Sequence, residues 1–82
     1  MSDLMITNTK YLTFKKMKSH CKKTYDVAIE NKQGYYLGTI SWYGPFRKYT
    51  FRPDSDTVWD KSCLNEITKY LDQLMKEWSS QS

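Results

Sequence analysis

The chain has 82 residues, of which 16% are aromatic, and its 13 basic and 9 acidic side chains give a net charge of +4. This length predicts one domain, and the aromatic content excludes an intrinsically disordered chain. The apolar runs are too short to cross a bilayer, and the N-terminus lacks the basic start and apolar run of a signal peptide. We therefore expect a soluble protein located in the cytoplasm, with no membrane partner.

Residues 11–53 predict a meander of three or four antiparallel strands, preceded by residues 1–10, which can form a disordered arm. Apolar and polar side chains alternate in the segments 24–31, 35–43 and 47–52, and more weakly in the lysine-rich segment 11–18. Turn residues separate these segments, and a proline ends the last one. Alternation assigns one group of residues to a shared apolar face: Val27, Ile29, Tyr36, Gly38, Ile40, Trp42, Tyr49 and Phe51. It assigns Leu37 to the opposite face.

From residue 61 to residue 79 the apolar period becomes helical, and Asp60 or Ser62 can cap the start. Five apolar residues recur in steps of three or four and form one stripe: Leu64, Ile67, Leu71, Leu74 and Trp78. One amphipathic helix can cover only one face of the meander. We expect an α+β fold in a single domain, residues 1–82, with this C-terminal helix on one sheet face and the other face open.

Groups suited to catalysis or metal binding are few. The single histidine, His20, adjoins Cys21, and together with Cys63 these residues lack the paired short spacing of a zinc site. No glycine-rich phosphate-binding motif occurs among three glycines, and two cysteines make no disulfide framework. We expect a protein that is not an enzyme, with free thiols, no metal and no cofactor.

The segment 37–67, "LGTISWYGPFRKYTFRPDSDTVWDKSCLNEI", resembles a pattern in small uncharacterised proteins of bacteriophages and prophages. The matching residues are Leu37, Gly38, Ile40, Trp42, Tyr43, Arg47, Tyr49, Phe51, Pro53, Thr57, Val58, Cys63, Leu64 and Ile67. Phe46 departs from the pattern, in which tryptophan precedes the arginine, and residues 1–23 lie outside it. The resemblance implies a mobile-element origin. Such proteins often bind a host factor, including host defence systems, and inhibit or redirect it.

Two kinds of partner remain open. The first is a host protein, bound through open-face residues of the types that interface centres favour: Tyr35, Tyr43, Arg47, Lys48 and Arg52. The second is nucleic acid, bound through the basic sheet face and a lysine cluster made of Lys10, Lys15, Lys16, Lys18, Lys22 and Lys23. A lysine-rich hairpin that only aids solubility explains the same charge. A free edge strand can also pair across a two-fold axis and give a homodimer.

Overall fold

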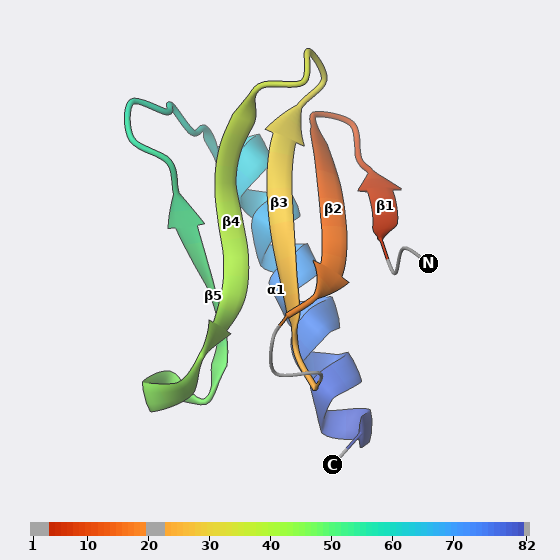
Figure 1. Ribbon diagram of the computed structural model, residues 1–82. Coiled ribbons are helices and arrows are strands. Elements are labelled where there is room, and N and C mark those ends of the chain that lie inside the picture. The colour runs from red at the N-terminus through yellow and green to blue at the C-terminus, as the bar shows by residue number, and fades with distance from the viewer. Residues whose placement is uncertain (1–3, 20–22, 82) are drawn as a thin grey trace.

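Figure 1 shows the computed structural model, which describes residues 4–19 and 23–81. An antiparallel sheet of five strands lies against one long helix, and each strand pairs with the next along the chain. Short hairpins therefore make every connection within the sheet. The elements are β1 (Met5–Asn8), β2 (Leu12–Lys18), β3 (Tyr25–Asn31), β4 (Tyr36–Tyr43), the 3₁₀ turn η1 (Gly44–Phe46), β5 (Lys48–Pro53) and α1 (Lys61–Gln81).

The expected α+β architecture, an antiparallel meander with one C-terminal helix, is confirmed, but the sheet has five strands rather than three or four. The additional strand is β1, which lies within the segment 1–10 that was expected as an arm. Met5 pairs with Lys16 and Asn8 with Thr13, so β2 is not an edge strand. A four-residue strand exposed on both faces shows no alternation, and only its pairing with β2 defines it.

A bulge in β4 exchanges the faces of two neighbouring residues. Ile29 pairs with Gly38 and Glu30 with Tyr36, which leaves Leu37 without a partner in β3. Leu37 therefore packs against the core, whereas Tyr36 is 48% exposed and lines a depression on the other face. The sequence-based assignment of both residues was wrong, because strict alternation fails where one strand contains an extra residue.

The core lies between α1 and one face of the sheet. Its buried residues are Leu12, Phe14, Val27, Ile29, Ile40 and Tyr49 from the strands and Ile67 and Leu74 from the helix. Aromatic pairs surround this centre: the Phe14 ring stacks on Tyr70 with centroids 4.3 Å apart, and Trp42 meets Trp78 at 4.5 Å. These large side chains supply the burial that so short a chain needs.

The helix begins where Asp60 caps it. The Asp60 carboxylate accepts a hydrogen bond of 2.9 Å from the Cys63 N–H, and this bond lowers the pKa of Asp60. Leu64, expected in the apolar stripe, is 43% exposed. The stripe is centred on Ile67 and Leu74, and Leu64 lies at its margin, in the first turn of α1 and about 60° round the helix from Ile67. Among the residues described, no helix is long and apolar enough to span a membrane.

Replacement of Leu74 by alanine should lower the free energy of unfolding by about 2–5 kcal/mol, because it leaves a cavity at the centre of the helix–sheet contact. Leu64→Ala is the matched control and should cost less than about 1 kcal/mol, since Leu64 is 43% exposed and lies outside the buried centre of the core. Urea unfolding followed by circular dichroism measures both. Equal losses would contradict the assignment of the core.

Gly38→Ala should also destabilise the fold, by about 1–3 kcal/mol, because β4 and β5 approach closely there. A Cβ atom at Gly38 would lie 2.7 Å from the Arg52 carbonyl oxygen and 3.1 Å from the Pro53 Cα, both backbone atoms. Gly44→Ala is the control, since a Cβ there meets nothing within 4 Å. The same unfolding experiment compares the two, and a neutral Gly38→Ala would show that the strands can separate without cost.

Candidate functional site

The sheet face opposite α1 carries no covering element in the described part of the chain. Figure 1 looks onto this face, with the helix behind the strands. We call it the uncovered face. Many of its side chains are polar or charged, among them Thr13, Lys15, Asp26, Glu30, Thr39, Ser41, Thr50 and Arg52. Functional residues on this face are accessible to a partner without any unfolding of the core.

Aromatic and basic side chains gather where β4 turns into β5. The Tyr43 and Phe46 rings meet edge to face with centroids 4.7 Å apart, and the Arg52 guanidinium carbon lies 5.9 Å from the Tyr43 ring centroid. Lys48 is the cross-strand partner of Tyr43. We call Tyr43, Phe46, Lys48 and Arg52 the hairpin patch. Phe46 is 63% exposed, so the patch presents an aromatic ring to solvent.

The turn conformation explains how Phe46 comes to lie against Tyr43. Pro45 stands in the first turn of η1, where its fixed φ suits the helix and its missing N–H is not needed. Arg47 then adopts a left-handed conformation with φ 54°, and its N–H donates to the Gly44 carbonyl at 3.0 Å. This closed turn holds Phe46 beside the strand end rather than leaving it on a loose loop.

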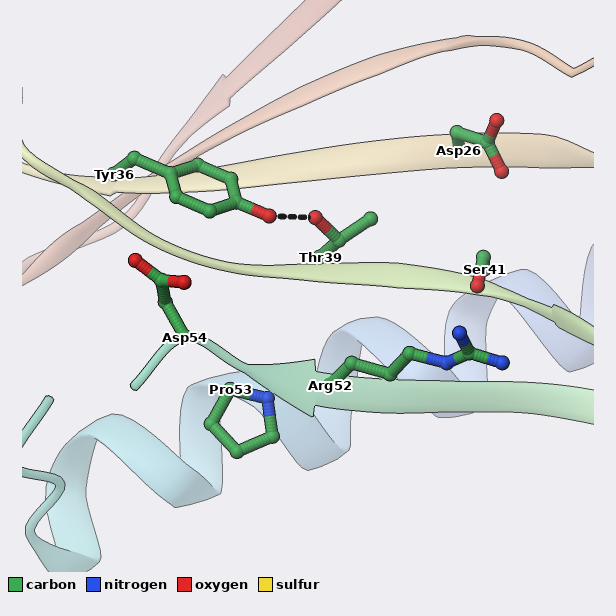
Figure 2. Close-up of a pocket in the computed structure, with 7 residues that line it drawn as sticks. All are labelled: Asp26, Tyr36, Thr39, Ser41, Arg52, Pro53 and Asp54. Carbon is green, nitrogen blue, oxygen red and sulfur yellow. Dashed lines mark hydrogen bonds between the residues drawn. The ribbon is translucent and has the colours of Figure 1, made fainter. Parts of the chain in front are cut away.

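A shallow depression of about 480 Å³ adjoins the hairpin patch on the uncovered face. Figure 2 shows Arg52 extending from β5 toward Ser41 on β4, and the Tyr36 hydroxyl hydrogen-bonded to that of Thr39. The depression is lined by Asp26, Tyr36, Thr39, Ser41, Arg52, Pro53 and Asp54. Arg52, together with Tyr43 and Phe46, also lines a second depression of about 350 Å³. Its side chain therefore borders both depressions.

Arg52 is the side chain of this surface that is best suited to bind a charged group of a partner. Within residues 4–19 and 23–81, no carboxylate lies within ion-pair distance of Arg47, Lys48 or Arg52. A guanidinium without an ion-pair partner, beside hydroxyl groups and an aromatic ring, can accept a carboxylate in a two-pronged arrangement. Asp26 and Asp54 give the depression an acidic component as well. The surface is therefore suited to polar recognition with an aromatic anchor.

The structure brings together four of the five residues predicted for partner binding. Tyr43, Lys48 and Arg52 belong to the hairpin patch, and Arg47 lies in its turn. Tyr35 is 66% exposed but lies in the β3–β4 turn, at the opposite end of the sheet (Figure 1). Phe46 and Tyr36 are surface residues that were not predicted as such. The Gly-Pro-Phe turn indicated an exposed Phe46, whereas nothing in the sequence indicated the bulge that exposes Tyr36.

The lysines of the N-terminal half do not form one surface. Lys16 is 8% exposed, lies on the covered face and pairs with Glu77 at 2.7 Å, whereas Lys15 lies on the other face and pairs with Glu30 at 3.0 Å. Lys10 lies at one end of β2, and Lys18 and Lys23 lie at the other (Figure 1). Lys22 is outside the described residues. The lysines that are described therefore point in several directions.

The chemically reactive groups show no arrangement for catalysis in the described part of the chain. Burial, with a smaller contribution from the nearby Asp60, raises the pKa of the Cys63 thiol to about 11. This thiol is protonated at neutral pH and is a poor nucleophile. Residues 4–19 and 23–81 contain no group of three potential metal ligands. His20 and Cys21 lie outside the described residues.

Fold and surface together define a small α+β protein with one helix-covered sheet face and one uncovered face bearing an aromatic and arginine patch. Comparison with known proteins gives its relationship. The chain is 49% identical over 73 residues to the uncharacterised 9.3 kDa protein of Acholeplasma phage L2, a match that spans 88% of this chain and 94% of the phage protein. The chain therefore belongs to the family of that phage protein.

This relationship agrees with the resemblance of the segment 37–67 to small phage proteins. The residue pattern given for that group stays a prediction. No family model matches the chain. No solved structure matches it either.

The substitution Glu77→Gln tests whether the ion pair between the buried Lys16 and Glu77 stabilises the fold. Its bond with Lys16 lowers the pKa of Glu77, so the ion pair stabilises the fold above the ordinary glutamate pKa and ceases to do so as the pH falls through the lowered value. At pH 7 the variant should lose on the order of 1 kcal/mol, because the pair is partly open to water. The difference from the native protein should begin to shrink as the pH falls below about 5, near the ordinary glutamate pKa, and should disappear below the lowered pKa of Glu77. Unfolding free energies across this range measure it, and a constant difference would contradict the ion pair's role.

Proposed function

We propose that this member of a phage protein family acts by binding a host protein, which it inhibits or redirects, and that the hairpin patch is its contact surface. One observation carries the proposal: Tyr43, Phe46 and Arg52 are clustered on an uncovered sheet face, with Phe46 63% exposed. Tyrosine and arginine are the residues on which the energy of protein interfaces is often concentrated.

The patch is arranged before any partner arrives. The 4.7 Å contact of Phe46 with Tyr43 and the position of Arg52 beside the same ring restrict all three side chains. Binding through restricted side chains loses less conformational entropy than binding through mobile ones. Aromatic side chains with two torsion angles add large contact areas at small entropic cost. This pre-arrangement favours recognition of a defined protein surface.

Charge indicates what that surface should carry. The hairpin patch and its turn contain three basic side chains, Arg47, Lys48 and Arg52, and no acidic one, although Asp26 and Asp54 line the adjoining depression. An acidic partner surface would be attracted to this end of the sheet and would meet the Arg52 guanidinium with a carboxylate. We therefore expect a host protein that presents an apolar contact flanked by aspartate or glutamate.

Nucleic-acid binding, the alternative, has less support from the geometry. A phosphate backbone is best followed by several cations on one surface. Here Lys15 and Lys16 lie on opposite sheet faces and each is paired with a glutamate. Neither lysine is free for phosphate without the loss of an existing ion pair.

The test is capture of host proteins by the tagged native chain and by the double variant Phe46→Ala, Arg52→Glu. The native chain should retain a stoichiometric band from nuclease-treated host lysate. The double variant should bind the isolated band at least about tenfold more weakly, since it loses the aromatic anchor and reverses a charge.

The matched control is Val58→Ala, Lys76→Glu, which makes the same types of change at exposed positions outside the patch. It should bind as the native chain does, and circular dichroism should show all three proteins folded. Equal affinity of the patch variant would refute this contact surface. Capture that disappears with nuclease would instead identify nucleic acid as the ligand.

A further inference from the structure

The two edges of the sheet differ in how they are protected against pairing. The β5 edge carries Lys48, Arg52 and Pro53, which are residue types that discourage the addition of another strand. The β1 edge, with the sequence Met-Ile-Thr-Asn, contains no charge and no proline. One edge of this sheet is therefore closed to a further strand and the other is open to it.

The backbone of β1 has hydrogen-bonding groups directed outward. The Thr9 N–H donates to the Leu12 carbonyl at 2.9 Å, which makes these two residues a hydrogen-bonded pair at the β1–β2 turn. Such pairs alternate along an antiparallel ladder, so Thr7 and Met5 bond to β2, whereas Ile6 and Asn8 direct their N–H and C=O groups away from it. These outward groups are a template for another strand.

Apolar side chains accompany this template. Met5 and Ile6 are 59% and 55% exposed, and Met17 on the adjacent strand β2 is 44% exposed. Against an added strand, Met5 and Ile6 would gain cross-strand contacts on opposite faces of the sheet, whereas β1 separates Met17 from that strand. The edge thus offers hydrogen bonds and apolar burial together.

The two lysines that lie across from β1 in strand β2 are neutralised by glutamates. Its cross-strand neighbours Lys16 and Lys15 are paired with Glu77 and Glu30, at 2.7 Å and 3.0 Å. Lys32, which donates to the Asn8 side chain at 3.2 Å, has no ion-pair partner in the described chain, but it lies at the end of β1. Two copies of this edge can therefore meet at Ile6 without opposing unpaired lysines. Two copies of the β5 edge would bring Lys48 and Arg52, neither with an ion-pair partner in the described chain, into repulsion.

We propose that two copies of the protein pair through β1 across a two-fold axis and join their sheets into one continuous sheet. Residues opposite each other in an antiparallel pair project on the same face. A two-fold axis normal to the sheet therefore pairs Ile6 with Ile6 of the second copy, and Met5 with Thr7. The second copy is the occupant that this edge fits, because β1 itself carries no charge in either copy, and the symmetric arrangement closes after two chains.

The dimer interface consists of one short strand and a few side chains from each copy. It is therefore a small interface. We expect a dissociation constant on the order of 1–100 μM. The interface uses the edge remote from the hairpin patch, and host-protein binding and dimerisation can therefore succeed or fail separately (Figure 1).

Sedimentation equilibrium of the purified chain, without any partner, tests the proposal. The average mass should rise from that of one chain toward that of two as the concentration passes from about 1 μM to about 1 mM. Ile6→Lys should weaken association at least about tenfold, because it opposes two charges at the axis. Val58→Lys introduces the same charge at a residue that is 94% exposed and should leave association unchanged.

A second variant separates pairing from charge. Ile6→Pro removes the outward N–H but leaves the bonds of β1 to β2, since those involve Met5 and Thr7, and it should also give a monomer. Circular dichroism verifies that each variant is folded. A native chain that stays monomeric throughout, or a dimer that survives both Ile6 variants, would overturn the proposal.

Discussion

The contact between α1 and the sheet determines the rest of this structure. Ile67 and Leu74 of the helix complete a core with Val27, Ile29 and Ile40, and aromatic pairs extend it toward both ends of the helix. With one long helix for a five-stranded sheet, burial of one face leaves the other exposed to solvent. The uncovered face, the hairpin patch and the unprotected β1 edge all result from this shortage of covering elements.

Local features of the strands determine which side chains lie on each face of the sheet. Because of the β4 bulge, Leu37 packs against the core and Tyr36 lies on the uncovered face. One extra residue in β4 thus changes which side chains both faces carry. Lys16 lies among core residues because its stem passes beneath the helix and its ammonium group reaches Glu77. The preceding residue, Lys15, lies on the opposite face and pairs with Glu30. A basic dipeptide in a strand thus divides its charges between two environments.

Much of this fold could be predicted from the sequence, because the helix and strands β3 to β5 have strong and different apolar periods. What could not be predicted depends on tertiary pairing. Strand β1 is too short to show a period, and the bulge breaks the alternation at Leu37. Leu64 fits a three-to-four-residue spacing, but in the first turn of the helix its side chain is 43% exposed. For the candidate site, alternation placed Tyr43 and Arg52 on the uncovered face, whereas the position of Phe46 depended on the turn geometry.

The order of the elements has a consequence for how the protein is made. All five strands precede α1 in the chain, so a ribosome delivers the sheet before the segment that covers it. The 21 residues of the helix take about 1–4 s to synthesise, and during that interval Phe14, Ile29 and Ile40 have no permanent cover. Hairpins between neighbouring strands form in microseconds, so the nascent sheet is an early species with an apolar face open to chaperones. Burial of this face is therefore complete only when α1 has been made.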